Sequence, residues 1–433
     1  MARIVIIGAG LTGLSAAYHL EQQGFFDYQL FEKDETVGGL CRSVHQDKFT
    51  FDYTGHLLHA SDPYFRSLIE KVVGMEHLHS INRQSFIYSH ETYSRYPFQI
   101  NLYGLPPSII AECITGFVSR PISRKAPATF HQWVLKNFGK GIAKNFFFPF
   151  QNKIFAYDIR KVTTSWMGRF VPSTSLEQMI QGSIADKPVT TGYNAHFVYP
   201  KIGGIQFWIE KLAQQLKNPI QKGFAVESVN LKSKTIHFTN GHTTQFDSLI
   251  STMPLDHLLT GLEDNHKGSV LRRAAPKLLC NSVVNFNLGI NRKNLSDKHW
   301  IYFPEKKYPF YRIGFPHNFA PTAVPEGCSS LYGEFSYLKK PKAPMKKILD
   351  QAIGATQELL SFSKEEIITQ KIIQIPHAYV IYDEWREKNL PRILQTLEDN
   401  NIYSVGRYGG WKYSSMQEAV LDGKAVAEKI IST

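Results

Sequence analysis

The sequence predicts a mixed α/β protein built on a discontinuous domain with a parallel sheet. Two observations support this prediction. A β-branched run at residues 3–7 leads through a glycine turn into a helical pattern, and residues 402–431 repeat the order of strand, glycine turn and helix. A continuous apolar strand of this kind is typical of a parallel sheet covered on both faces. With 433 residues, the chain is long enough for two or three domains.

The N-terminal unit has the order strand, helix, strand. Residues 8–13 form a glycine turn, and residues 14–23 show the apolar spacing of a helix. Gly24 ends that helix, and residues 28–31 form a second strand that closes with Glu32. The chain therefore begins with a complete βαβ unit.

In the rest of the chain, the residue pattern predicts mainly helices at first and mainly strands later. Helical patterns broken by prolines dominate the part after the first unit, and a three-stranded meander and further short strands follow. The predicted helices cover 62–76, 105–140, 205–217, 344–361 and 415–431, and predicted strands lie at 196–199, 225–230, 235–239, 247–252, within 281–335 and at 402–405.

This pattern predicts three regions. Residues 1–60, 200–255 and 395–433 form the discontinuous parallel-sheet domain with its β-meander. Residues 61–199 form a mainly helical insert on the substrate side, and residues 256–394 form an antiparallel sheet with a helix. We find no internal repeat and no low-complexity linker between them.

Composition narrows the function classes. The net charge is +12, but the Lys and Arg residues are scattered and no nucleic-acid-binding signature is present, so an anionic small molecule is favoured over nucleic acid. None of the four cysteines lies in a CxxC pair. We therefore expect no metal site and no disulfide scaffold, and a cytoplasmic protein. No window approaches the ~20 apolar residues of a transmembrane segment. Whether the chain forms a homo-oligomer stays open.

The glycine turn after the first strand matches G-x-G-x-x-G. Its context is the one that makes this motif specific, because a strand precedes it, a helix follows it, and an acidic residue closes the next strand. The first glycine permits a tight turn, the second lets the backbone approach a pyrophosphate, and the third lets helix and strand pack closely. This Rossmann-like unit predicts that a dinucleotide is bound by Gly8, Gly10, Leu11, Thr12, Gly13, Glu32 and Lys33.

The segment after Glu32 separates FAD from NAD. Glu32 is followed by five residues and the pair Gly38-Gly39, and this pattern resembles the FAD-binding signature of the superfamily of amine oxidases, protoporphyrinogen oxidases and UDP-galactopyranose mutases. The resemblance implies that FAD is the cofactor, bound without a covalent link. It implies further cofactor contacts from Gly38, Gly39, Leu40, His56, Val226, Gly406, Arg407 and Met416.

Further segments resemble the eukaryotic-type UDP-galactopyranose mutases. They keep the order and spacing of that family along nearly the whole chain. In such enzymes the reduced flavin acts as a nucleophile on the sugar, so the isomerisation needs reduced FAD but consumes no reductant. The matching segments are residues 51–56, 96–99, 166–168, 194–197, 297–305, 309–312 and 406–413.

The resemblance also implies roles for single residues. His56 would lie against the flavin ring. Phe98 and Gln99 would hold the uracil, while Tyr379 and Tyr413 would bind the diphosphate through their hydroxyls. The remaining residues that the resemblance places in the catalytic or substrate site are Asn152, Asn194 and Tyr311.

Two positions depart from that family. Where the family has arginines for the diphosphate, this chain has Phe170 and Leu288. Arg169 and Arg292 are the nearest cations, and we expect them to take over if a nucleotide sugar binds, because a diphosphate without a guanidinium would lose its charge-assisted, bidentate hydrogen bonds.

A different enzyme class therefore stays open. Phe150 and Phe155 stand where the family would have a Tyr and a Trp, which makes the expected pocket more apolar. The alternative is an FAD-dependent oxidoreductase that takes hydride from an amine or an apolar ring substrate, as amine oxidases and protoporphyrinogen oxidases do. A third class, a flavoprotein without catalysis, is disfavoured because the cofactor motifs are complete.

Overall fold

The computed structural model describes residues 3–122, 124–167, 171–186, 195–263 and 266–432. Its parallel sheet confirms the predicted α/β class and has the strand order β19-β13-β1-β2-β9. All four strand pairs are parallel. The strands are β19 (Ile402–Ser404), β13 (Ser248–Ser251), β1 (Ile4–Ile7), β2 (Tyr28–Glu32) and β9 (Ile220–Lys222).

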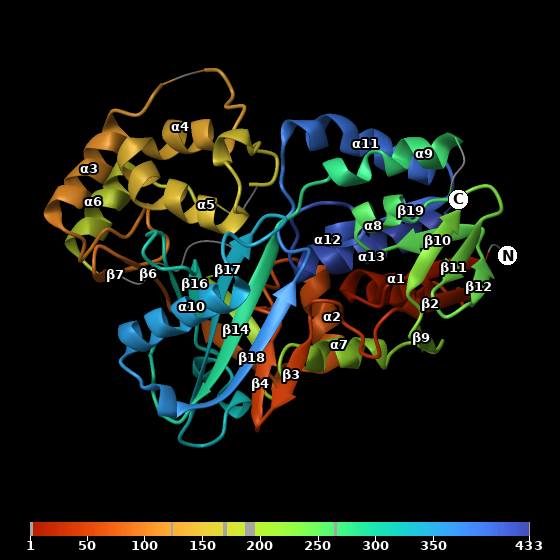
Figure 1. Cartoon of the computed structure of the whole chain (residues 1–433), viewed down its shortest axis with the longest axis horizontal. Coiled ribbons are helices and arrows are strands. Elements are labelled where there is room, and N and C mark those ends of the chain that lie inside the picture. Colours follow the sequence, from red (N-terminus) through yellow and green to blue (C-terminus); the bar gives the residue numbers. More distant parts are fainter. Residues whose placement is uncertain (1–2, 123, 168–170, 187–194, 264–265, 433) are drawn as a thin grey trace.

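Segments from the two ends of the chain meet in this sheet. Helix α1 (Leu11–Gln22) follows β1, and α13 (Met416–Ile431) packs directly against it. A Cβ built on Gly423 of α13 would lie 2.4 Å from the carbonyl oxygen of Thr12, so the two helix backbones are in close contact. Figure 1 shows α1 and α13 together on the right of the molecule, with both chain termini at that side.

The meander lies beside the parallel sheet, as the sequence predicts. It consists of β10 (Val226–Asn230), β11 (Thr235–Phe238) and β12 (Thr243–Gln245), joined in antiparallel order. Phe238 packs on Phe31 of the parallel sheet, with ring centroids 4.7 Å apart.

A seven-stranded, mainly antiparallel sheet forms the middle of the molecule. Helix α10 (Met345–Leu360) contributes apolar side chains to the same core cluster as β14 and β17. Figure 1 shows α10 beside the long strands of this sheet. In sheet order the strands are β18 (Ile367–Ile375), β14 (Ser282–Ile290), β17 (Ser329–Tyr337), β16 (Arg312–Gly314), β15 (Trp300–Tyr302), β6 (Ser85–Ser89) and β7 (Thr92–Arg95).

Residues 61–199, which the sequence predicts to be a mainly helical insert, also contribute strands. From that stretch, β6 and β7 join the sheet that residues 256–394 supply. In addition, β5 (Leu78–Asn82) pairs with β8 (His196–Pro200). The partners β15 of β6 and β8 of β5 lie more than 100 residues away in the chain, and a local apolar pattern does not show such pairing.

The helices of that insert pack closely on one another. They are α3 (Pro107–Val118), α4 (Phe130–Ile142), a π-helical turn η2 (Ala143–Phe147), α5 (Phe148–Phe155) and α6 (Leu176–Ile184), seen at the upper left of Figure 1. A Cβ on Gly141 of α4 would lie 2.1 Å from the carbonyl oxygen of Glu112 in α3, so only glycine fits at this crossing.

The remaining elements connect these layers. They are β3 (Ser43–Gln46), β4 (Phe49–Asp52), α2 (Pro63–Val73), α7 (Gln206–Ala213), α8 (Leu255–Thr260), α9 (His266–Arg272), α11 (Glu384–Glu398) and α12 (Gly406–Gly409), with short 3-10 turns between them. Among the described residues, no helix is both long and apolar enough to cross a membrane.

Candidate active site

The glycine turn after β1 has the geometry that its motif requires. Gly8 has φ +94°, and a Cβ there would lie 2.4 Å from the Thr252 Oγ1 atom. A Cβ on Gly13 would lie 1.9 Å from the carbonyl oxygen of Gly8. Gly10 is the N-cap residue of α1, and no side chain caps this helix end. The N–H groups of the first turn of α1 are therefore available to an anion.

The second glycine pair lies opposite this turn. Gly38 and Gly39 have φ values of +112° and +59°, and the Gly38 N–H donates to the Ala9 carbonyl oxygen at 2.8 Å. A Cβ on Gly10 would lie 3.8 Å from the Gly39 Cα atom, in the space between the two loops. A pyrophosphate that lies along these backbones therefore needs glycine on both sides.

Glu32 is held in place at the end of β2. It is buried, its Oε2 atom accepts from the Ala9 N–H at 2.7 Å, and its Oε1 atom accepts from the Asp34 N–H at 3.0 Å. A carboxylate has about four lone-pair sites, so two remain for ribose hydroxyls. Lys33 beside it is exposed.

The other predicted cofactor residues lie on three elements around the turn. Gly406 opens α12 with φ +82°, and a Cβ there would lie 2.6 Å from the Thr12 Oγ1 atom. Met416 begins α13 and is buried, while Val226 begins β10 of the meander. Leu11 is buried in the first turn of α1, and Leu40 packs at the edge of a separate small core. Together these features fit FAD.

His56 lies in the loop after β4 and is the most distinctive group near this turn. Its Nδ1 atom is buried, and no described residue bonds to it. Burial, together with the nearby positive charges of Arg407 and Arg312, lowers the pKa of its imidazole to about 4. The ring is therefore neutral near pH 7.

Arg407 is a half-buried cation held by neutral groups. Its two terminal nitrogens donate to the carbonyl oxygens of Ser414 at 2.5 Å and Ala378 at 2.9 Å. Its guanidinium carbon lies 4.9 Å from the Tyr413 ring centroid and 5.7 Å from that of Tyr379. Within the described part of the chain, no carboxylate forms an ion pair with it. A half-buried positive charge without a carboxylate partner favours a bound anion.

The two tyrosines over Arg407 form a stacked pair. The ring centroids of Tyr379 and Tyr413 are 6.4 Å apart and the planes differ by 13°. Burial raises the pKa of Tyr379 to about 12, so its hydroxyl stays protonated and can donate a hydrogen bond. The Tyr413 N–H donates to the Tyr382 hydroxyl at 2.6 Å, which fixes the backbone beneath the pair.

Arg312 is a site residue that the sequence analysis did not single out, although it closes one of the matching segments. Its guanidinium forms two hydrogen bonds with Glu334, at 2.7 and 3.1 Å. A Cβ on Gly55, next to His56, would lie 2.3 Å from the Tyr332 hydroxyl and 3.8 Å from an Arg312 nitrogen. Apart from that segment, the sequence shows only an arginine between apolar residues of a strand, which is too common to identify a site.

The predicted uracil and substrate residues are partly brought together. Phe98 is fully buried and stacks on Phe146 at 5.2 Å, and Tyr311 is also buried. The Gln99 amide donates to the Pro172 carbonyl oxygen at 2.7 Å. Asn152, in contrast, is exposed on α5, where its amide donates to the Phe148 carbonyl oxygen.

Arg292 is not part of this site. Its guanidinium pairs with Glu366 at 2.7 and 2.8 Å, just beyond the end of β14. The opposite end of β14 reaches the tyrosine pair, since the Tyr379 N–H donates to the Asn281 Oδ1 atom at 2.8 Å. At ~3.3 Å per residue, a nine-residue strand separates these ends by about 30 Å. This placement corrects the expectation that Arg292 serves the diphosphate.

Four further positions from the sequence lie in the core or outside the described residues. Leu288 is fully buried in the apolar core under α10, so that side chain cannot meet a diphosphate. Arg169, Phe170 and Asn194 lie outside the described residues.

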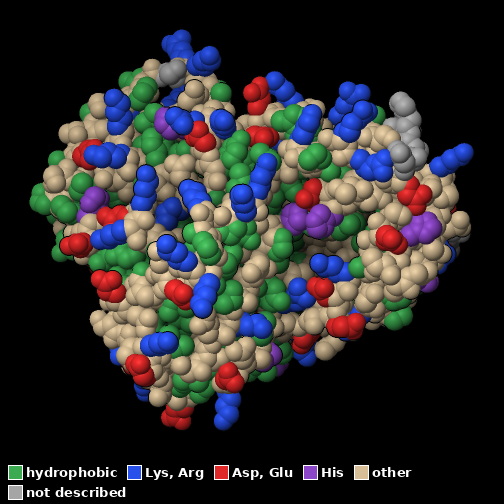
Figure 2. Space-filling view, viewed as in Figure 1, with side chains coloured by type: hydrophobic (Ala, Val, Ile, Leu, Met, Phe, Trp, Pro, Cys, Tyr) green, Lys and Arg blue, Asp and Glu red, His purple; other side chains and the backbone are tan. Residues whose placement is uncertain are grey.

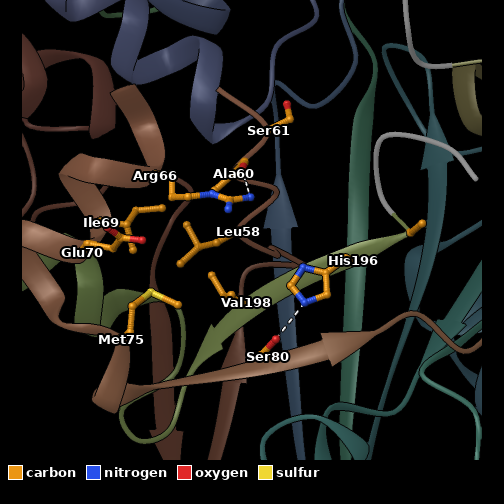
Figure 3. A pocket seen from close by; sticks show the side chains of 11 residues that line it. Leu58, Ala60, Ser61, Arg66, Ile69, Glu70, Met75, Ser80, His196 and Val198 are labelled. Atoms are coloured by element: carbon orange, nitrogen blue, oxygen red, sulfur yellow. Dashed lines mark hydrogen bonds between the residues drawn. The ribbon is translucent and has the colours of Figure 1, made fainter. Parts of the chain in front are cut away.

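A separate pocket of about 470 Å³ lies between α2 and the pair β5–β8. Figure 3 shows Leu58, Ile69 and Val198 on its apolar floor, with Arg66 across it and His196 bonded to Ser80 at its edge. None of the predicted cofactor or substrate residues lines it, so we do not assign it to the active site.

Comparisons with known proteins agree with this geometry. The family model for flavin-containing amine oxidoreductases matches residues 11–431. A crystal structure of reduced UDP-galactopyranose mutase is similar with a TM-score of 0.93 and 28% identity, over 100% of this chain and 94% of that chain.

Two further proteins are similar to this chain. Coproporphyrinogen III oxidase of Bacillus subtilis (strain 168) is 26% identical over 360 residues, which are 75% of each protein. A protein of Exiguobacterium sp. 255-15, provisionally assigned as a protoporphyrinogen oxidase, has a TM-score of 0.78 at 17% identity over 100% of this chain and 99% of its own, which shows the shared fold. The chain belongs to the flavin-containing amine oxidoreductase family and is an FAD-dependent enzyme.

Proposed function

We propose that this flavoenzyme isomerises a nucleotide sugar in the manner of a UDP-galactopyranose mutase. The observation that carries the proposal is the group formed by Tyr379, Tyr413 and Arg407 next to His56. It offers two tyrosine hydroxyls and the half-buried positive charge of Arg407 beside the cofactor turn. The likeness to the reduced mutase, at 28% identity over the whole chain, supports the same assignment.

Each residue of this group has a defined task in such a reaction. The hydroxyls of Tyr379 and Tyr413 donate hydrogen bonds to diphosphate oxygens, and the charge of Arg407 makes that position favourable for an anion. The charge of Arg312 is balanced by Glu334, so Arg312 contributes directed N–H donors to the site and little net charge. His56 stays neutral and adds no charge beside the flavin. Bound FAD, held by the Gly8–Gly13 turn and Glu32, supplies the nucleophile when it is reduced.

A second candidate is an oxidoreductase acting on an apolar ring or amine substrate. The observation in its favour is a ladder of stacked rings behind the site. Phe98 stacks on Phe146 at 5.2 Å, and Phe146 stacks on Phe150 at 5.0 Å. In addition, Leu288 stands where the mutase family has an arginine for the diphosphate. Arg292, the nearest cation in the sequence, pairs with Glu366 and does not replace it. The similarity to a coproporphyrinogen III oxidase is consistent with this alternative.

One anaerobic experiment separates the two candidates. The protein is reduced with dithionite and incubated with UDP-galactopyranose or UDP-galactofuranose, and the nucleotide sugars are separated by chromatography. The mutase proposal expects interconversion only by reduced protein, with the flavin still reduced afterwards. The oxidised protein is then mixed with putrescine or coproporphyrinogen III. Bleaching of the flavin in proportion to one of these substrates, without sugar interconversion, would overturn the proposal in favour of the oxidoreductase.

A further inference from the structure

Three side chains outside the catalytic group come together at the edge of the parallel-sheet domain. Asp256 and His257 lie in the first turn of α8, and His377 lies just after β18. The His377 Nε2 atom is 2.9 and 3.1 Å from the two Asp256 carboxylate oxygens, and one ligand atom from each of the three residues lies within 4.8 Å of the other two. Figure 2 shows histidine side chains together at the surface over α8 and α12.

We propose that Asp256, His257 and His377 form a binding site for a divalent transition-metal ion such as Zn²⁺. Two imidazole nitrogens and one carboxylate oxygen are ligands that Zn²⁺ and its neighbours in the series accept, whereas Mg²⁺ and Ca²⁺ favour oxygen ligands. Zinc bonds of ~2.0–2.2 Å place neighbouring ligand atoms about 3.3 Å apart in a tetrahedral site. The His377–Asp256 contact already has nearly this separation.

The surroundings of the cluster favour an ion over a simple His–Asp contact. The Asp256 Oδ1 atom also accepts the His257 backbone N–H at 2.9 Å, which orients the carboxylate. The rings of His257 and His377 are 4.8 Å apart and nearly perpendicular, so the second imidazole lies close to the His377–Asp256 pair. His257 is exposed and can rotate to shorten the remaining distance, while one coordination position stays open to water.

An ion at this position would join two parts of the enzyme. Helix α8 follows Thr252, whose hydroxyl donates to the Ile7 carbonyl oxygen beside the cofactor turn. His377 is followed at once by Ala378, whose carbonyl oxygen binds Arg407, and by Tyr379 of the stacked pair. The metal would therefore hold the segment that carries Tyr379 against the cofactor domain.

Zinc binding to the FAD-loaded protein tests this proposal. We expect one Zn²⁺ per chain by equilibrium dialysis with metal analysis, and a rise of the melting temperature with zinc concentration. His257→Gln and Asp256→Asn should each weaken binding at least tenfold. His257 is exposed and Asp256 is partly exposed, so both variants should fold and retain FAD, which the flavin absorbance checks.

Two controls separate this site from adventitious binding. His77→Gln removes an exposed histidine that faces only one carboxylate, Glu76 at 3.4 Å, and should leave zinc binding unchanged. Cys280→Ser, which removes a nearby free thiol, should also leave it unchanged. With Cu²⁺ as the probe, electron paramagnetic resonance of the oxidised holoprotein should show coupling to nitrogen that His257→Gln reduces. Equal binding by wild type, His257→Gln and Asp256→Asn would overturn the proposal.

Discussion

At the scale of single residues, the cofactor turn depends on the absence of side chains. A Cβ on Gly10 would point into the space between the turn and Gly39. We expect Gly10→Leu to abolish FAD binding, because the side chain takes the place of the pyrophosphate. The ratio of flavin absorbance to protein absorbance after purification measures this.

Gly354 of α10 offers a matched control for that substitution. No heavy atom lies within 4 Å of a Cβ built at Gly354, and its backbone is helical. Gly354→Leu should therefore retain a full complement of FAD. A yellow Gly10→Leu protein with one flavin per chain would show that the cofactor lies elsewhere.

The tyrosine pair makes a second prediction at this scale. If a nucleotide sugar binds as proposed, Tyr413→Phe removes one hydrogen bond to the diphosphate, worth ~0.5–1.5 kcal/mol, or roughly a two- to tenfold loss of UDP affinity. Arg292→Ala should leave that affinity unchanged, because Arg292 pairs with Glu366 at the far end of β14. Titration of UDP against flavin fluorescence compares the two variants. A larger loss in Arg292→Ala would contradict the placement of the site.

At the scale of elements, buried histidines make the stability of the fold depend on pH. The His299 Nδ1 atom, just before β15, accepts the N–H of Gln84, the residue before β6, at 3.0 Å. Burial lowers the pKa of His299 to about 4, below the ~6.5 of the unfolded chain. Between these values the unfolded chain binds more protons than the folded protein, so stability is complete above pH 6.5 and is lost as the pH falls toward 4.

His299→Gln tests this link. Glutamine keeps an acceptor for the Gln84 N–H but has no proton to gain, so the free energy of unfolding should fall less between pH 6.5 and 4, by on the order of 2–3 kcal/mol. Urea unfolding at several pH values measures the difference. Burial also lowers the pKa of His56 to about 4. The free energy of unfolding of the variant therefore still falls with pH, but less steeply than that of the wild type. An unchanged slope would mean that His299 is not buried in the neutral form.

At the scale of the whole molecule, FAD should act as a structural link. The predicted cofactor contacts come from the N-terminal unit, from Val226 in the meander and from Gly406 and Met416 near the C-terminus. A ligand that binds only the folded arrangement stabilises it by about 2.7 kcal/mol at a free concentration of 100 Kd. We expect the melting temperature of the FAD-free protein to be lower and to rise steadily with added FAD.

The same experiment has a clear control and a clear contrary outcome. AMP, which offers only the adenosine end to Glu32 and the α1 turn, should raise the melting temperature less than FAD at equal concentration. A melting temperature that does not respond to FAD would mean that the cofactor does not connect these segments.

The amino-acid sequence alone determined the cofactor half of the protein. The residues that define the cofactor turn are close together in the chain, namely Gly8, Gly10, Gly13, Glu32 and the Gly38–Gly39 pair. Each is required by the local backbone, through a positive φ, a close approach or a hydrogen bond to the turn. Local spacing therefore suffices to predict the turn, the helix that follows it and the class of ligand. The β-meander and the C-terminal strand, turn and helix were predictable for the same reason.

Only the tertiary structure decided the substrate side. Arg312 is joined to Glu334, Arg407 to the stacked Tyr379 and Tyr413, and β6 to β15 across more than 200 residues of sequence. The position of Arg292 at the far end of β14 could not be seen from its nearness to Leu288 in the chain. The Asp256–His257–His377 cluster likewise has no sequence spacing that a metal motif would show. Strand pairing and register bring such residues together or keep them apart, and these depend on packing between distant segments.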